Sequence, residues 1–135
     1  MFKQADIAPE WPNSKTIAGI VLIVPLVLGL IHKYGVIGIV VPLLAFFLSK
    51  DRFVKFHAAQ FLLLLLMSFP IGIIMLIIMF GGIAIKVKEL SMLSPLLGMA
   101  WLIVAGLLWL YQIYSAFTGR APMYPLIGKR AAEVA

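Results

Sequence analysis

The residues best suited to chemistry are concentrated in one short stretch, Phe53 to Gln60, directly before the longest apolar run of the chain. On a helix, where each residue turns by about 100°, Phe53, His57 and Gln60 fall on one face. Arg52 and Phe56 border that face. The pattern therefore predicts a polar and aromatic face at the start of an apolar helix.

What this face does depends on what surrounds it. In a structural interpretation, Arg52 and Lys55 extend to lipid phosphates at a membrane surface. His57 and Gln60 then hydrogen-bond neighbouring helices or head groups. In a functional interpretation, the same face binds a partner or a polar segment at the membrane surface. Both interpretations place the face where an apolar helix leaves the lipid.

A neutral imidazole can also bind a metal axially, which would make His57 a ligand of haem or a pigment. The chain offers no second inward-facing histidine, because His32 falls in a predicted turn on the opposite side of the membrane. The chain contains no cysteine, which excludes thiolate metal sites, disulfides and thiol nucleophiles. We expect no metal and no cofactor, and axial ligation by His57 stays a separate alternative.

The carboxylates give no catalytic arrangement either. All five lie in tails or short polar segments, outside the apolar runs: Asp6, Glu10, Asp51, Glu89 and Glu133. Proton and ion relays place ionisable groups inside membrane spans, and proteolysis within a membrane needs paired aspartates or a nucleophile beside a base. We therefore expect a protein that is not an enzyme and does not couple transport to charge.

Composition places these elements in lipid. The 135 residues are 64% hydrophobic and 12% charged, and the mean hydropathy is +1.13, far outside the soluble range. Several apolar runs approach or exceed the roughly 20 residues with which a helix crosses a hydrocarbon core. The net charge of +6 comes from basic residues flanking these runs, which set topology and contact anionic head groups. We expect an integral membrane protein that binds anionic lipid and no nucleic acid.

Polar residues divide the chain into four predicted transmembrane helices, at about 16–32, 35–49, 53–85 and 93–118. Lys33 separates the first two, because a lysine in the middle of one long span would cost about 2.5–3.5 kcal/mol. Both are short, so either they borrow flanking residues, or this hairpin thins the bilayer or stops short of crossing it. Prolines inside the first three helices predict kinks, at Pro25, Pro42 and Pro70.

The third helix is expected to begin after Asp51, whose carboxylate can cap it. Residues 53–85 would extend roughly 50 Å, longer than the hydrocarbon core, so the first turns up to Gln60 must lie outside it. The polar segment 86–91 is predicted to be a loop. Ser94 and Gly98 follow at a spacing of four, which predicts a small-residue contact face on the last helix.

Charge counting predicts the orientation. Eight Lys and Arg residues lie on the side of the two tails and the second loop, and three lie on the other side. By the positive-inside rule, both termini and the stretch 53–60 face the cytoplasm. The expected organisation is a cytoplasmic tail 1–15, a membrane domain 16–118 and a cytoplasmic interfacial tail 119–135.

The last segment is unusual for a tail. Gly119 is a natural helix C-cap, and Pro122 and Pro125 prevent the helix from continuing. Four residues beside these prolines are too apolar to remain in water: Met123, Tyr124, Leu126 and Ile127. We expect them to dock near the stretch 53–60.

Two motifs together resemble a known family: Phe-Val-Lys-Phe-His-Ala-Ala-Gln at 53–60, and Ala-x-x-Gly-Arg at 116–120 leading into Tyr-Pro-Leu-Ile-Gly at 124–128. The family comprises the central channel-like subunit of the chloroplast inner-envelope protein import translocon and bacterial and archaeal relatives, mostly of unknown function. The resemblance covers about residues 16–128. It implies a four-helix fold and, for the plastid members, a part in protein translocation or assembly of a membrane complex.

The resemblance implies no catalytic residues. Its signatures match Phe56, His57 and Gln60 in the first motif and Gly119, Pro125 and Gly128 in the second. The chain shows no plastid targeting extension. We therefore expect a prokaryotic member in the cytoplasmic membrane.

Taken with the residues, the resemblance leads us to expect a non-enzymatic membrane subunit, an accessory or structural component of a larger complex or of protein translocation and assembly. Its partner would be another membrane protein or a second copy. The expected contact residues are Arg52, Phe53, Lys55, Phe56, His57, Gln60, Gly119, Arg120, Tyr124, Pro125 and Gly128. The alternatives are a small channel or carrier for a weakly polar or lipid-like solute, gated by the kinks, and an electron-transfer subunit with a cofactor on His57.

Overall fold

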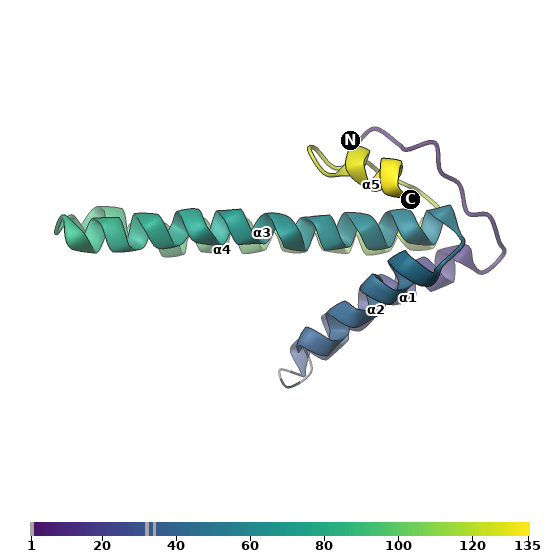
Figure 1. Ribbon diagram of the computed structural model, residues 1–135, viewed down its shortest axis with the longest axis horizontal. Coiled ribbons are helices and arrows are strands. Elements are labelled where there is room, and N and C mark those ends of the chain that lie inside the picture. Colours follow the sequence, from purple (N-terminus) through teal and green to yellow (C-terminus); the bar gives the residue numbers. More distant parts are fainter. Residues whose placement is uncertain (1, 32, 34) are drawn as a thin grey trace. The chain divides into compact units, whose positions relative to one another are not determined.

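The computed structural model describes residues 2–31, 33 and 35–135, and over these residues the protein is all-α (Figure 1). Its helices are α1 (Ser14–Leu30), α2 (Gly35–Leu48), α3 (Arg52–Ala84), α4 (Lys88–Thr118) and α5 (Gly128–Val134). The predicted all-α class is confirmed. α3 and α4 are long and apolar enough to cross a membrane, and α1 and α2 are shorter apolar helices of 17 and 14 residues. His32, assigned to a predicted turn, lies outside the described residues.

The chain forms two compact units. The terminal unit comprises Met1–Leu63 and Trp109–Ala135, and the hairpin unit comprises Leu64–Leu108. α3 and α4 each contribute to both units. The chain's termini and all the motif residues therefore belong to the terminal unit.

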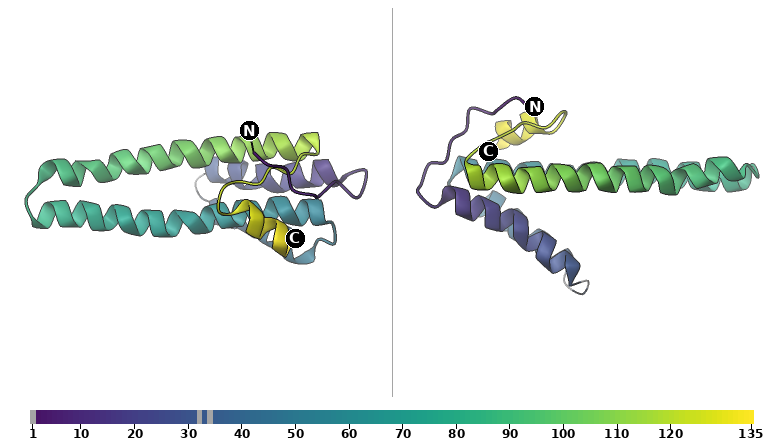
Figure 2. Two further views of the ribbon diagram at one scale, coloured as in Figure 1. Left: turned by 90° about the horizontal axis from the view of Figure 1, so that it is seen from above. Right: turned by 180° about the vertical axis from the view of Figure 1, so that it is seen from behind.

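In the hairpin unit, α3 and α4 run antiparallel, side by side, and are joined by a tight turn (Figure 2). Ser94 donates a hydrogen bond to the carbonyl of Met75 at 2.8 Å, and a Cβ at Gly98 would meet the Met75 side chain at 2.5 Å. The predicted contact face is confirmed at both positions. A Cβ at Gly82 would meet the backbone nitrogen of Ser91 at 2.5 Å, so the helices are also close beside the turn.

The start of α4 differs from the prediction. The helix begins at Lys88 and not at 93, so the predicted loop 86–91 shrinks to 85–87. Lys86 turns the chain with a left-handed backbone (φ 58). Glu89 lies in the first turn, where its charge suits the positive end of the helix. The prediction was wrong because these charged residues, good helix formers, had been assigned to the loop; the other predicted helix limits agree to within two residues.

Most apolar side chains of α3 and α4 face outward. Only 11% of the most apolar 18-residue window in each helix is buried inside the protein. A core helix of a soluble protein would be mostly buried. This exposure agrees with the length and composition that qualify both helices as possible membrane spans.

In the terminal unit, α1 and α2 pack as the predicted hairpin, and glycines allow close approach. A Cβ at Gly38 would meet the Cα of Pro25 at 2.8 Å. The start of α1 also packs against α4, because a Cβ at Gly19 would clash with the Phe117 ring. Trp109 donates from its indole nitrogen to the carbonyl of Leu22 at 3.0 Å. The hairpin is therefore held to α4 by both apolar and polar contacts.

The predicted kink residues lie inside helices that continue on both sides of them: Pro25 in α1, Pro42 in α2 and Pro70 in α3. Pro25 and Pro42 are buried. Each proline removes one backbone hydrogen bond from its helix. A kink at these positions stays a prediction.

Candidate functional site

The site begins with the cap of α3. Asp51 accepts a hydrogen bond from the Phe53 amide at 2.9 Å through one carboxylate oxygen, and the Ser14 hydroxyl donates to the other oxygen. Ser14 also accepts from the Trp11 amide at 2.9 Å. The predicted capping role of Asp51 is confirmed. The same carboxylate joins the start of α1 to the start of α3, which the sequence did not indicate.

The predicted polar and aromatic face exists, and apart from Arg52 at its border it is buried. Phe53, Phe56, His57 and Gln60 are all 0% exposed. The rings of Phe53 and Phe56 meet the imidazole of His57 edge-on, with centroids at 4.6 and 5.4 Å. Burial excludes water from the face, so any hydrogen-bond partners of its polar atoms lie within the protein.

His57 finds one partner in the C-terminal segment. Its Nε2 lies 3.0 Å from the carbonyl oxygen of Arg120. Because a carbonyl only accepts, Nε2 must carry the hydrogen, which assigns the tautomer and leaves Nδ1 as an acceptor. Nδ1 has no hydrogen-bond partner among the described residues.

Gln60 binds the same segment at two successive points. Its Nε2 donates to the carbonyl of Pro122 at 3.0 Å, and its Oε1 accepts from the Tyr124 amide at 3.4 Å. The side-chain amide thus donates and accepts one hydrogen bond each, as a peptide group of an adjacent strand would. This arrangement holds the segment extended across the start of α3.

Gln112 of α4 completes the buried polar contacts and was missed in the sequence. Its Nε2 donates to the backbone carbonyl of His57 at 2.7 Å, and the residue is 0% exposed. Its Oε1 has no partner among the described residues. The sequence did contain a signal, because a carboxamide inside an apolar run is costly to bury without a hydrogen-bond partner. Ser115 and Ala116, one helical turn after Gln112, are also buried.

The N-terminal segment covers the C-terminal segment. Gln4 and Pro122 form an antiparallel bridge, with hydrogen bonds from the Met123 amide to the Lys3 carbonyl and from the Ala5 amide to the Ala121 carbonyl, each 2.8 Å. The Gln4 side chain accepts from the Ala121 amide at 3.0 Å. The two ends of the chain are therefore tied to each other and to α3.

Tyr124 lies at the centre of this cover. It is 2% exposed, and its ring packs on that of Phe2 with centroids 5.1 Å apart. Burial, with the neighbouring Tyr111 adding to it, holds the pKa of Tyr124 above its usual range. The phenol is therefore neutral at physiological pH.

The expected docking of the C-terminal segment is confirmed for most of its apolar residues. Tyr124 and Ile127 are buried and Met123 is half-buried, but Leu126 is 83% exposed. Leu126 adopts a left-handed backbone (φ 69) at the tip of a tight turn, in which the Ile127 amide donates to the Pro125 carbonyl at 2.8 Å. The prediction was wrong for Leu126 because the turn directs its side chain outward.

α5 was not predicted. A Cβ at Gly128, its first residue, would meet the Cα of Met123 at 2.5 Å, so only glycine allows this approach. Ala131 is buried on the inner side, while Arg130 and Glu133 form an exposed ion pair at 3.2 Å. The composition of 129–134, rich in good helix formers, was the available signal.

The predicted contact residues differ in exposure. Phe53, Phe56, His57, Gln60, Tyr124 and Gly128 are buried, Lys55 and Gly119 are half-buried, and Arg52, Arg120 and Pro125 are exposed. The structure brings the two motifs into direct contact with each other. The buried members are occupied by the chain's own segments, and only the remainder is free to meet another molecule.

The polar side chains of the site are engaged with the chain itself. The side chains of His57, Gln60 and Gln112 all bond to backbone groups of this chain. Within the part of the chain that the structure describes, no cluster of three or more His, Cys, Asp or Glu residues could hold a metal ion. Comparison with protein-family models, with curated proteins and with solved structures gives no match for this chain.

Proposed function

We propose that the protein is a non-enzymatic subunit of the cytoplasmic membrane of a prokaryote, an accessory or structural component of a larger complex or of protein translocation and assembly. One observation carries the proposal. The side chains most capable of chemistry, His57, Gln60 and Gln112, are wholly buried and bind the chain's own backbone. Side chains that bind the chain's own backbone in this way hold its segments together and are not available to act on a substrate.

The membrane arrangement in this proposal has four crossings. α3 and α4 supply two spans, and the α1–α2 hairpin supplies two short ones that thin the bilayer around them. Basic residues support the orientation: eight Lys and Arg residues lie on the side of the two tails and the start of α3, and Lys33, Lys86 and Lys88 lie on the other side. By the positive-inside rule, both termini face the cytoplasm.

The proposed partner is another membrane protein or a second copy of this chain. Because the 53–60 face is covered by the two terminal segments, the partner meets what they leave exposed, including Arg52 and Arg120. The resemblance to the translocon family gives the proposal its context. The contact between the two motifs gives a physical reason for their occurrence together, since His57 and Gln60 of the first hydrogen-bond to the backbone of residues 120–124.

Photo-crosslinking in the native membrane tests the proposal. A photoreactive residue in place of Arg52 or Arg120 is expected to give discrete crosslinked species that survive purification in mild detergent. The same residue in place of Lys88, which is exposed in the hairpin unit, serves as the matched control. A monodisperse monomer with no crosslink from either position would contradict the proposal. Solute flux in reconstituted vesicles that changes in Pro70→Ala would instead favour the channel or carrier.

A further inference from the structure

An apolar groove of about 450 Å³ lies on the terminal unit between α2, α3 and α5. Its lining residues are Phe46 of α2, Ala59, Leu62 and Leu63 of α3, and Arg130 and Val134 of α5. The volume is within the roughly 300–1,000 Å³ typical of small-ligand sites. The groove is separate from the buried polar face, and nothing in the proposed function uses it.

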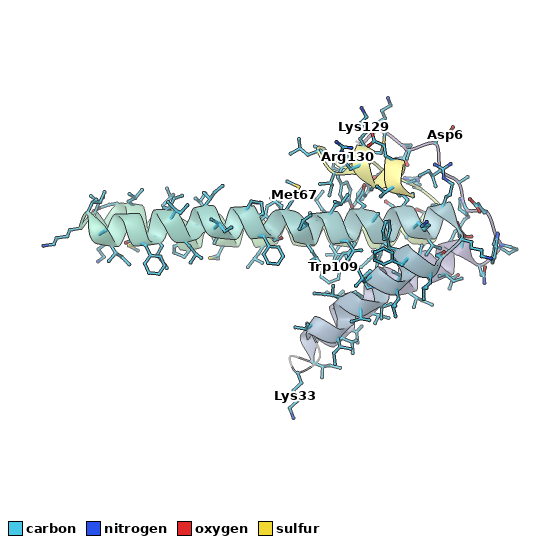
Figure 3. The ribbon with its side chains drawn as sticks, viewed as in Figure 1. Asp6, Lys33, Met67, Trp109, Lys129 and Arg130 are labelled. Atoms are coloured by element: carbon cyan, nitrogen blue, oxygen red, sulfur yellow. The ribbon has the colours of Figure 1, made fainter. Side chains whose placement is uncertain are left out.

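One cation lines this groove, and a second lies beside one of its wall residues. Arg130 lines it directly, and its side chain is 77% exposed and extends from α5 (Figure 3). The Lys55 ammonium lies 5.8 Å from the centroid of the Phe46 ring, which forms part of the wall. Glu133 pairs with Arg130 at 3.2 Å, but an exposed pair of this kind contributes little and leaves other guanidinium N–H groups available.

The polarity of the groove changes along α3. Leu62 and Leu63, which line the groove, belong to the start of the apolar run of α3, whereas Lys55 belongs to its polar first turns. A ligand that fits has an apolar chain at one end and an anionic group at the other. Guanidinium and ammonium groups both bind phosphate, the guanidinium in a bidentate manner.

A protein partner fits this groove poorly. Stable protein interfaces bury roughly 800 Å² on each partner, more than six lining side chains can provide. A lipid needs only a channel for one acyl chain and a basic group at its mouth. The proposed function places α5 and the start of α3 at the cytoplasmic surface, and the site rests on this placement, because the groove then opens at the level of the lipid head groups.

We propose that this groove binds one anionic phospholipid, with an acyl chain along Leu62 and Leu63 and the phosphate between Lys55 and Arg130. The site rests on the membrane location given in the proposed function, but not on the identity of any protein partner. It would hold a lipid between α2, α3 and α5 and so fasten the short α5 to the membrane surface.

Native mass spectrometry of the full-length protein, purified in detergent and titrated with lipid, tests the site. The probes are phosphatidylglycerol and phosphatidylcholine with identical acyl chains. We expect one retained phosphatidylglycerol and a preference over phosphatidylcholine of about fivefold for each of the two basic residues. The double variant Lys55→Gln/Arg130→Gln should lose this preference, and the charge-matched control Lys86→Gln/Lys88→Gln should keep it.

A second variant tests the acyl-chain part of the groove. Val134 is 49% exposed, so Val134→Trp can be accommodated and should fill the groove, reducing the retention of both lipids. Equal retention of the two lipids by the unmodified protein, or an unchanged preference in the double variant, would overturn the lipid site. Crosslinking from Arg52 and Arg120 in the same samples separates the two proposals, because a lost lipid preference with intact crosslinks rejects only the lipid site.

Discussion

Gln60 illustrates how a single side chain organises this protein. Its amide donates to Pro122 and accepts from the Tyr124 backbone, at 3.0 and 3.4 Å. Both contacts join residues more than sixty positions apart. A carboxamide at the start of an apolar helix therefore serves as the attachment point of the C-terminal segment, with His57 one turn earlier supplying a second one.

The expected effect of removing this attachment is large. In Gln60→Leu, the Pro122 carbonyl and the Tyr124 amide lose their partner while still buried, which costs about 1–3 kcal/mol for each unsatisfied group. The C-terminal segment should exchange its amide hydrogens faster and become open to proteolysis. Hydrogen exchange measured by mass spectrometry on the protein in detergent checks this.

Asn13→Leu is the control for this experiment. Asn13 is exposed and its side chain makes no capping hydrogen bond, so its replacement should change stability by less than about 0.5 kcal/mol. If Gln60→Leu protects residues 120–128 as well as the unmodified protein does, the attachment is not a stabilising one.

At the scale of the elements, close approach of helices depends on a few glycines. Gly38 of α2 lies against the backbone of Pro25 in α1, whereas nothing lies within 4 Å of a Cβ built at Gly29. Glycine is conformationally unfavourable within a helix, by roughly 0.5–1 kcal/mol relative to alanine. The close contact with Pro25 explains why position 38 is a glycine.

Substitution at these two glycines should separate packing from helix propensity. Gly38→Leu is expected to force α1 and α2 apart and to destabilise the protein by about 1–3 kcal/mol, the usual effect of overpacking. Gly29→Leu, the matched control, adds the same side chain in open space and should be neutral or slightly stabilising. Thermal unfolding in mild detergent measures both, and equal effects would show that the contact is not tight.

At the scale of the whole molecule, the feature to test is the number of membrane crossings. α3 and α4 have the length and composition to cross, and α1 and α2 are shorter. Lys33, in the short connection between α1 and α2, is exposed and extends away from it (Figure 3). The side of the membrane on which Lys33 lies therefore shows whether the α1–α2 hairpin crosses.

Because the chain contains no cysteine, single cysteines can be introduced without background labelling. In intact cells, an impermeant maleimide is expected to label Lys33→Cys and Lys88→Cys. Lys129→Cys should be labelled only after permeabilisation, since the proposed topology places α5 in the cytoplasm. A Lys33→Cys that is protected in intact cells would show that the α1–α2 hairpin does not cross.

Much of the fold could be predicted because it depends on local and compositional properties. Apolar runs separated by charged residues indicated α1 to α4, and the cap at Asp51 followed from its position before a long helix. The start of α4 and the existence of α5 were missed where charged residues or prolines stood near a helix of good local propensity.

The candidate site could be located but not understood from the sequence. His57 and Gln60 were recognised as unusual, yet their burial, their bonds to residues 120–124 and the part played by Gln112 depend on contacts between distant segments. Pairing of the N-terminal residues Lys3 and Gln4 with the C-terminal segment has no local signal at all.

By itself, the sequence determined the helical class, the helices long enough to cross a membrane and the stretch in which polar chemistry is concentrated, because hydrophobic length and helix periodicity are properties of neighbouring residues. The tertiary structure decided that this stretch is a buried joint covered by the chain's own ends. The physical reason is that burial favours hydrogen bonds within the protein, and which of the distant backbone groups becomes the partner of His57 or Gln60 is set only when the helices pack.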